Sequence, residues 1–342
     1  TTAEGKVYEL VPASTKGNET GTVESGQTKE VTYVYKEVKG NVVVHYTDEA
    51  GNKIAEDAKD TTDGSISTPY DTSDNGMKPD RITTPEGKVY ELVPASTKGA
   101  ETGKVTEGTT EVTYVYKEVT GDVVVHYVDT EGNVIAEDKE DTKGASLNAK
   151  YDTTDNKPEK IEKDGTVYYL TEKAVKDDSK PENGDVVEGK TEVTYVYEKA
   201  GQVVVHYTDE KGNTLQADAV DTKDGKPNAD YNTADNDMKP NRITTPEGKV
   251  YELIPQSTKG DETGKVKAGE TTEVTYVYKE ITGNVVVHYV DTEGNTLAED
   301  TKDVENGSLS DKYDTTDNKP AKLEKDGTVY YLTAKELKDG SK

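Results

Sequence analysis

The sequence lacks several residue types on which common protein functions depend. Its 342 residues include no cysteine, tryptophan or phenylalanine, only two methionines and only four histidines. Without cysteine there is no disulfide framework, no thiolate metal site and no cysteine nucleophile. Serine is sparse and never stands in a Gly-x-Ser-x-Gly motif, the nucleophile turn of many hydrolases. We therefore predict that the chain is not an enzyme and has no catalytic residues.

Positive charge is also scarce. Lysine and arginine number 42 against 69 aspartates and glutamates, which gives a formal net charge of -27. No basic run is long enough to follow a phosphate backbone, so nucleic acid is not expected as a partner. The negative charge disfavours contact with an anionic membrane, and no apolar run approaches the length that spans a bilayer. We expect no membrane contact within this sequence.

Apolar residues make up only 30% of the chain, a proportion near that of disordered proteins. They are not scattered, however. They form short alternating runs of valine and tyrosine between Asp, Asn, Gly and Pro, the pattern of small strands and turns. We expect folded, mainly β modules whose thin cores use tyrosine in place of phenylalanine. In the alternative interpretation, exposed tyrosines and acidic residues form a face that binds glycan or protein.

The chain is a tandem repeat of one small module. The stretch Val-Val-Val-His-Tyr occurs four times, each time shortly after a glycine, and these glycines lie 81, 80 and 82 residues apart by subtraction of their numbers. Two types of repeat alternate: type A carries Thr-Thr-Pro-Glu-Gly-Lys-Val-Tyr-Glu-Leu, and type B carries Glu-Lys-Asp-Gly-Thr-Val-Tyr-Tyr-Leu. The predicted domains are 1–39 (C-terminal half of a repeat), 40–120 (type A), 121–200 (type B), 201–282 (type A) and 283–342 (N-terminal part of a type B repeat).

The first strand of a repeat alternates between two faces. Val123, Val125 and Tyr127 point one way, and we assign this face to the core because threonine replaces Val128 on the other face in type A repeats. Residues 129–133, Asp-Thr-Glu-Gly-Asn, predict a turn with glycine where a positive φ is needed. We expect residues 134–136 to be the returning strand of this hairpin.

The rest of the repeat predicts a loop, a second hairpin and a closing strand. Residues 151–158 read as an ordered loop, because their side chains favour hydrogen bonds to their own backbone. Ile161 begins a strand that turns at residues 163–165 and returns over 167–170, and residues 171–176 predict one or two helical turns. Residues 192–197 alternate again and form the last strand. We count five strands per repeat.

The junctions between repeats are short. About five residues separate the last tyrosine of one repeat from the next Val-Val-Val, with no run of Pro, Ser or Gly that would act as a flexible tether. Each interface has an apolar residue to bury, Val119, Val38 or Ile281. We therefore expect stiff junctions with modules stacked end to end. From spacing alone, the short gap could equally be the loop of a hairpin within a single domain.

Few residues qualify as ligands. The histidines occur one per repeat, so no repeat supplies a pair for metal binding, and we expect solvated strand histidines. Acidic clusters in the middle of the repeats could offer oxygens to calcium, but they lack the EF-hand pattern, and turn-forming Asx residues explain them as well. We expect no metal and no cofactor; an isopeptide bond would need a buried lysine that nothing singles out. The residues considered are His45, His126, His206 and His288, with Asp71, Asp74, Asn75, Asp152, Asp155 and Asn156.

The repeat begins with Val-Val-Val-His-Tyr-Val-Asp-Thr-Glu-Gly-Asn, continues with Tyr-Asp-Thr-Thr-Asp-Asn-Lys-Pro and closes with Glu-Val-Thr-Tyr-Val-Tyr. In these motifs it resembles the MucBP repeat and the related streptococcal high-identity tandem repeats, and the resemblance covers the whole chain. It implies extracellular, mostly β modules of ubiquitin-like (α+β) or related topology on the wall of a Gram-positive bacterium, forming a monomeric rod. Two functions follow: a stalk that projects a separate ligand-binding region, or multivalent adhesive repeats that bind mucin glycans or a host surface glycoprotein.

Overall fold

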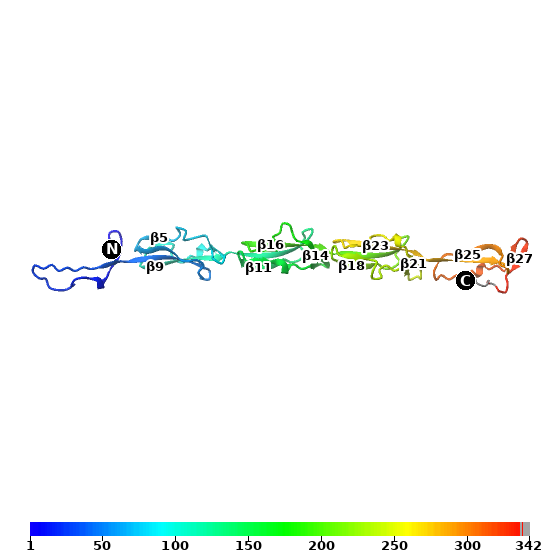
Figure 1. Ribbon diagram of the computed structural model, residues 1–342, viewed down its shortest axis with the longest axis horizontal. Helices are drawn as coiled ribbons and strands as arrows, with labels where there is room; N and C mark the ends of the chain where they lie inside the picture. The colour runs from blue at the N-terminus through cyan, green and yellow to red at the C-terminus, as the bar shows by residue number, and fades with distance from the viewer. Residues whose placement is uncertain (336, 338–342) are drawn as a thin grey trace. The chain divides into compact units, whose positions relative to one another are not determined.

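The computed structural model describes residues 1–335 and 337. Almost all of its regular structure is β-strand, and helices occur only as short 3-10 turns (Figure 1). Among the described residues there is no α-helix, and hence none long and apolar enough to cross a membrane. The chain forms two compact units, described separately below: residues 1–128, 136–158 and 173–196 in the first, and residues 129–135, 159–172 and 197–342 in the second.

Seven strands occupy residues 39–118 of the first unit: β3 (Lys39–Asp48), β4 (Ala58–Ser65), β5 (Pro69–Asp71), β6 (Arg81–Thr83), β7 (Val89–Leu92), β8 (Thr102–Lys104) and β9 (Gly108–Glu118). Five of them form one sheet in the order β4-β3-β9-β7-β6, while β5 and β8 pair as a separate ribbon. At the centre, β3 and β9 run parallel, with Val42 opposite Thr110 and Tyr46 opposite Tyr114. The flanking pairs are all antiparallel.

The parallel pair decides how the repeats are connected. The Val-Val-Val strand β3 pairs with β9, the closing strand some seventy residues later in the same repeat. β10 (Thr120–Asp129), which follows β9 after a single residue, belongs to a different sheet. The gap between repeats is therefore a connection from one sheet to the next, and the alternative of a hairpin across it is wrong here.

The core of this sheet is made of valine and tyrosine from alternating positions. Val44, Tyr46, Val112, Tyr114 and Tyr116 are buried in one cluster. A strand turns successive side chains to opposite faces, so His45 between two buried residues faces outward and stays partly exposed. A second, smaller cluster joins the sheet to the β5–β8 ribbon through Val42, Tyr70 and Val105. The predictions of the core face and of tyrosine as a core residue are confirmed.

Residues 120–199 continue with the same succession of strands, but the 3-10 turn, η3 (Thr153–Asn156), follows the third strand. The strands are β10, β11 (Lys139–Ser146), β12 (Lys150–Asp152), β13 (Lys160–Lys163), β14 (Thr166–Val175), β15 (Asn183–Asp185) and β16 (Gly189–Lys199). β10 pairs with β11, β12 with β15, and β13 with β14, all antiparallel. The core side chains of the first strand, Val123, Val125 and Tyr127, are buried as predicted.

The second unit contains another complete sheet, in the order β18-β17-β23-β21-β20, and a ribbon of β19 and β22. Its central strands are again parallel, with Tyr207 opposite Tyr276. Val205, Tyr207, Val274, Tyr276 and Tyr278 are among its buried core residues. The strands are β17 (Gly201–Asp209), β18 (Ala219–Gly225), β19 (Asp230–Asn232), β20 (Arg242–Thr244), β21 (Val250–Leu253), β22 (Thr263–Lys265) and β23 (Thr271–Glu280).

The two ends of the chain hold parts of a repeat. The remaining elements are β1 (Tyr8–Leu10), η1 (Pro12–Ser14), β2 (Tyr35–Glu37), η2 (Pro94–Ser96), η4 (Pro255–Ser257), β24 (Thr282–Val290), β25 (Thr296–Ser308), η5 (Thr315–Asn318), β26 (Lys322–Lys325) and β27 (Thr328–Tyr331). In residues 1–39, Tyr33 and Tyr35 are about half exposed, whereas their equivalents Tyr114 and Tyr116 are fully buried by the neighbouring strands of a five-stranded sheet.

Three expectations are corrected. Residues 134–136 are not a returning strand: Ile135 drops into the core, and the strand that pairs with β10 starts at Lys139. Residues 171–176 are not a helix, because β14 continues through Val175. Each complete repeat has seven strands rather than five, since β12, at the start of the predicted loop, pairs with β15 in a segment that had no predicted strand, and the other complete repeats have equivalents of both. The helix of a ubiquitin-like fold is absent from the described residues, so the mainly β prediction holds and the α+β alternative does not.

Candidate functional site

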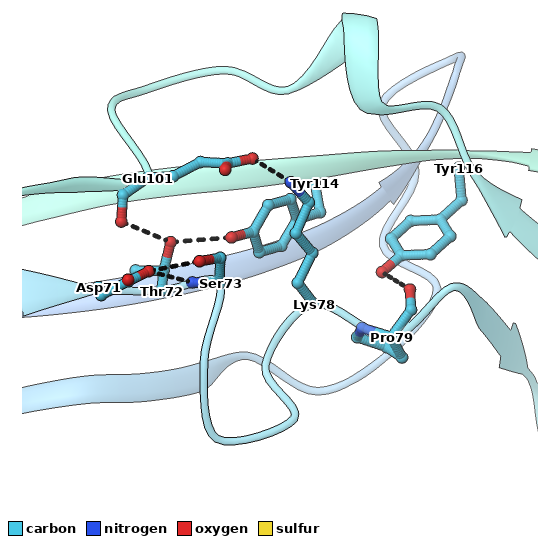
Figure 2. A network of polar contacts seen from close by, with 8 residues as sticks. All are labelled: Asp71, Thr72, Ser73, Lys78, Pro79, Glu101, Tyr114 and Tyr116. Carbon is cyan, nitrogen blue, oxygen red and sulfur yellow. Dashed lines mark hydrogen bonds and ion pairs between the residues drawn. The ribbon is translucent and has the colours of Figure 1, made fainter.

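A buried polar network ties the middle loop of each repeat to the sheet (Figure 2). The Thr72 hydroxyl lies 2.9 Å from the Tyr114 hydroxyl and donates to the Glu101 carbonyl oxygen, which also accepts from the Thr72 amide. Lys78 Nζ pairs with the Glu101 carboxylate at 2.5 Å and lies 5.3 Å from the centre of the Tyr114 ring. Burial raises the pKa of Tyr114 above its usual value.

Two further hydroxyls hold the same loop. Tyr116 donates to the Pro79 carbonyl oxygen at 2.9 Å, and Tyr46 donates to the Met77 carbonyl oxygen at 2.8 Å. A buried carbonyl that is left without a donor costs free energy, so each hydroxyl has a structural task that phenylalanine could not perform. This explains why the cores contain tyrosine and no phenylalanine.

The network recurs in the other two complete repeats. Its members are Thr153, Lys157, Glu182 and Tyr195 in one, and Thr233, Lys239, Glu262 and Tyr276 in the other. In each, the threonine is fully buried and bonds to both a tyrosine hydroxyl and a glutamate carbonyl. A network closed on itself in this way stabilises the loop and offers no free group to a ligand.

The acidic cluster considered for calcium forms turns around its own backbone. Asp71 Oδ1 accepts hydrogen bonds from the Ser73 amide and hydroxyl, and Asp152 Oδ1 accepts from the Thr154 amide. Asp74 accepts from its neighbour Asn75. Within the described part of the chain, no group of three or more His, Asp or Glu side chains converges to hold a metal ion. The expectation that this cluster binds no metal stays a prediction.

Each histidine lies beside an aspartate twelve residues further on, on the outer face of its sheet. His126 Nδ1 is 2.7 Å from Asp138 Oδ1, and His45 Nδ1 is 3.1 Å from Asp57 Oδ2. The other two pairs are His206 with Asp218 and His288 with Asp300. No described lysine is buried, so the condition for an isopeptide bond is not met among those residues.

The joints between repeats bring together side chains of two successive repeats. At the first full joint, one residue separates β9 from β10, and this residue, Val119, is 8% exposed. Its amide donates to the Val89 carbonyl oxygen, so the backbone stays in the ladder up to the joint. Gly121 then passes so close to Val187 that a Cβ would lie 1.9 Å from that carbonyl oxygen. Only glycine fits there, and Gly40 and Gly201 are in the same situation.

A carboxylate clamp crosses this joint inside the first unit. Glu118, the last residue of β9, accepts a hydrogen bond from the hydroxyl of Ser146, which lies at the end of β11 in the next repeat. Lys88 Nζ binds the other carboxylate oxygen at 3.0 Å. The serine bond, together with the lysine charge, holds the pKa of Glu118 below its usual value.

A second contact reinforces the same joint. Arg81 donates two hydrogen bonds to Glu188 of the next repeat, Nη1 to Oε2 at 3.0 Å and Nη2 to Oε1 at 3.1 Å. A bidentate arginine–carboxylate pair fixes direction as well as distance. Both side chains are about half exposed, so the pair contributes orientation more than stability.

The joint at residues 199–201, inside the second unit, uses different groups. Tyr169 donates from its hydroxyl to the Asp224 carbonyl oxygen at 3.1 Å, and Lys226 pairs with Glu159 at 2.8 Å. Lys199 stands at the position of Glu118, because the Ala200 amide donates to the Val167 carbonyl oxygen just as the Val119 amide donates to that of Val89. At Glu198, one residue earlier, burial and the nearby Glu172 charge raise the pKa of the carboxyl group.

A protein-family comparison matches nearly the whole chain. The MucBP domain matches five times, at residues 1–36, 41–117, 122–198, 202–279 and 284–341. The chain belongs to the MucBP domain family. The predicted resemblance to the MucBP repeat is therefore confirmed.

Two similar proteins give the family context. Muramidase-released protein of Streptococcus suis is 43% identical over 65% of this chain and 20% of its own length. Internalin J of Listeria monocytogenes is 29% identical over 82% of this chain and 29% of its own length. The chain thus spans less than a third of either relative. A structure of streptococcal high identity repeats in tandem from a cell surface protein is 9% identical over 47% of this chain and all of its own, with a TM-score of 0.20.

Sequence reasoning found the joints but missed the residues that cross them. Val119 is buried as predicted. Glu118, Ser146, Arg81 and Glu188 carried no separate signal, because charged and hydroxyl residues are abundant in every turn of the MucBP repeats. The one available signal was that the residues at these positions differ between type A and type B repeats.

Proposed function

We propose that this chain is part of the stalk of a Gram-positive cell-surface protein, in which MucBP repeats hold a separate ligand-binding region at a distance from the cell wall. The observation that carries the proposal is the joint between repeats. One residue separates the strands of successive sheets, and the Glu118 clamp and the Arg81–Glu188 pair cross from one repeat to the next. A stalk needs joints that resist bending, and these contacts supply that resistance.

The absence of a convergent site among the described residues also favours this function. The buried polar networks are closed on themselves, and the histidines face aspartates of their own repeats. Near-identical repeats add length with every copy, whereas a single binding site would be needed only once. The residues that make specific contacts therefore serve the cores of the repeats and the joints between them.

The test measures whether the joint sets the distance between repeats. Cysteines introduced at the exposed residues Glu49 and Glu137, on either side of this joint within the first unit, can be labelled selectively, because the chain has no native cysteine. Single-molecule fluorescence transfer should give one narrow distance in the wild-type chain. The double change Val119→Gly and Thr120→Gly removes one buried side chain, worth about 1.5 kcal/mol, and should broaden and shorten that distance without a comparable fall in melting temperature.

A matched control is Val220→Gly, which removes an exposed valine outside the joint. It should leave the labelled distance unchanged. If the joint variant keeps the wild-type distance, or if the wild-type chain itself shows a broad range of distances, the stalk proposal fails.

Multivalent adhesion is the second function that the family membership supports. It predicts that immobilised mucin retains the whole chain, and retains it more strongly than a shorter array of repeats. A stalk predicts no retention at any length. Retention that grows with the number of repeats would replace the stalk proposal with the adhesive one.

A further inference from the structure

The residues that meet at a joint vary in step with one another along the chain. Where a type A sequence comes first, a glutamate at its end accepts a hydrogen bond from a serine of the repeat that follows. Where the type B repeat comes first, Lys226 takes the place of that serine. The three glutamate–serine pairs are Glu37 with Ser65, Glu118 with Ser146 and Glu280 with Ser308.

The end of the preceding repeat changes at the matching positions. In type A, Lys88 completes the charge of the Glu118 clamp, and Lys6 and Lys249 do the same at Glu37 and Glu280. In type B, threonine replaces this lysine, and Tyr169 stands where type A has a glutamate. The tyrosine hydroxyl and Glu159 then become the groups that cross the joint.

The backbone that presents the variable residue is the same in every repeat. Two residues before it lies a residue with a left-handed backbone: φ is 49° at Asp63, 56° at Gly144, 49° at Asp224 and 54° at Asn306. In three of the four repeats the amide of this residue is bound by a side chain near the repeat's first glycine, as Gly144 is by Asp122. The front of a repeat is the end that meets the preceding repeat. Because the backbone is constant, the side chain at this position distinguishes one front from the other, and Ala268 in place of Glu188 is a second difference.

Exchanging the fronts would place the wrong chemistry at each joint. A lysine at position 146 would bring a second ammonium group to Glu118, which already binds Lys88. A serine at position 226 would take the cation away from Glu159, at an end where threonine replaces Lys88 and Lys199 stands at the position of Glu118. Like charges brought together and a lost ion pair both weaken an interface.

We propose that the ends and fronts of the repeats are matched interaction surfaces that determine which repeat type can follow which in a fixed orientation. The partner of a type A end is a front with serine, and the partner of the type B end is a front with lysine. The inference rests on the proposed stalk function, because matching matters only if a joint is held in one orientation.

The experiment measures the joint between 40–120 and 121–200 in the full chain. Spin labels on cysteines at the exposed residues Glu49 and Glu137, both in the first unit, report the distribution of distances across it by pulsed electron paramagnetic resonance. Ser146→Lys changes the front alone. A matched variant changes both sides. It combines Ser146→Lys with Asp80→Glu, Lys88→Thr, Glu91→Tyr and Glu118→Lys, so that an end with the type B residues at these positions meets a lysine front.

The expected result is that Ser146→Lys loses the narrow wild-type distribution and that the matched variant regains it. Lys226→Ser, with labels at Thr130 and Glu210, should broaden the other joint, and it provides a second test if a variant at position 146 fails to fold. The matching is overturned if Ser146→Lys stays as narrow as wild type, or if the matched variant is as broad as Ser146→Lys. A broad wild-type distribution would instead overturn the stalk function itself.

Discussion

The hydroxyl of one buried tyrosine in each repeat offers a direct test of how these thin cores are stabilised. Tyr114, Tyr195 and Tyr276 each place a hydroxyl 2.7–2.9 Å from a fully buried threonine. Changing all three to phenylalanine keeps the aromatic ring and its contact with the lysine above it, and removes only the hydroxyl. Substitution in all three repeats makes the effect visible in the melting of the whole chain.

The magnitude follows from the bonds that are lost and kept. A neutral buried hydrogen bond contributes about 0.5–1.5 kcal/mol, and the threonine keeps its other partner, the glutamate carbonyl. We therefore expect a loss of about 1 kcal/mol per repeat. For domains of this size that corresponds to a fall in melting temperature of about 4–8 °C.

The assay is differential scanning calorimetry of the full chain beside a matched control. The control changes Tyr33, Tyr35 and Tyr313 to phenylalanine, three tyrosines that are about half exposed. These hydroxyls face solvent, so the control should melt within a degree or so of wild type. If the buried set melts no lower than the exposed set, the hydroxyls do not stabilise the loop and the reason given for the absence of phenylalanine is wrong.

Three further outcomes are expected. Gly121→Ala should lower the melting temperature of its repeat, measured by calorimetry, because the added Cβ would lie 1.9 Å from the Val187 carbonyl oxygen; an unchanged melting curve would contradict the close approach. The pKa of Glu118 is lowered in the folded chain, so the joint that it clamps should loosen as pH falls through that pKa, and label distances across this joint measured from pH 7 to 3 should broaden; a distribution that stays narrow at pH 3 would contradict the role of the carboxylate. Burial raises the pKa of Tyr195 to about 12, so stability should fall as pH rises from about 10 towards that value, with tyrosinate absorbance in two steps rather than one.

The sequence by itself determined the elements that depend on local pattern. Strict alternation placed Val123, Val125 and Tyr127 on the core face, because a strand turns successive side chains to opposite sides. The second hairpin was equally legible: Asp164 and Gly165 take the positive φ values that their turn requires. The regular spacing of the glycines indicated a tandem repeat, and the short gaps indicated that successive repeats are joined closely.

Tertiary structure decided what local pattern leaves open. The strand β11 is almost entirely polar and pairs only because β10 offers it an edge, so no apolar alternation marked it. The parallel pairing of β3 with β9 depends on contacts some seventy residues apart, which no short window contains. The clamp of Glu118, Ser146 and Lys88 is formed by two repeats together, since each residue alone is an ordinary polar side chain at the end or start of a strand. Its chemistry exists only where one sheet ends and the next begins.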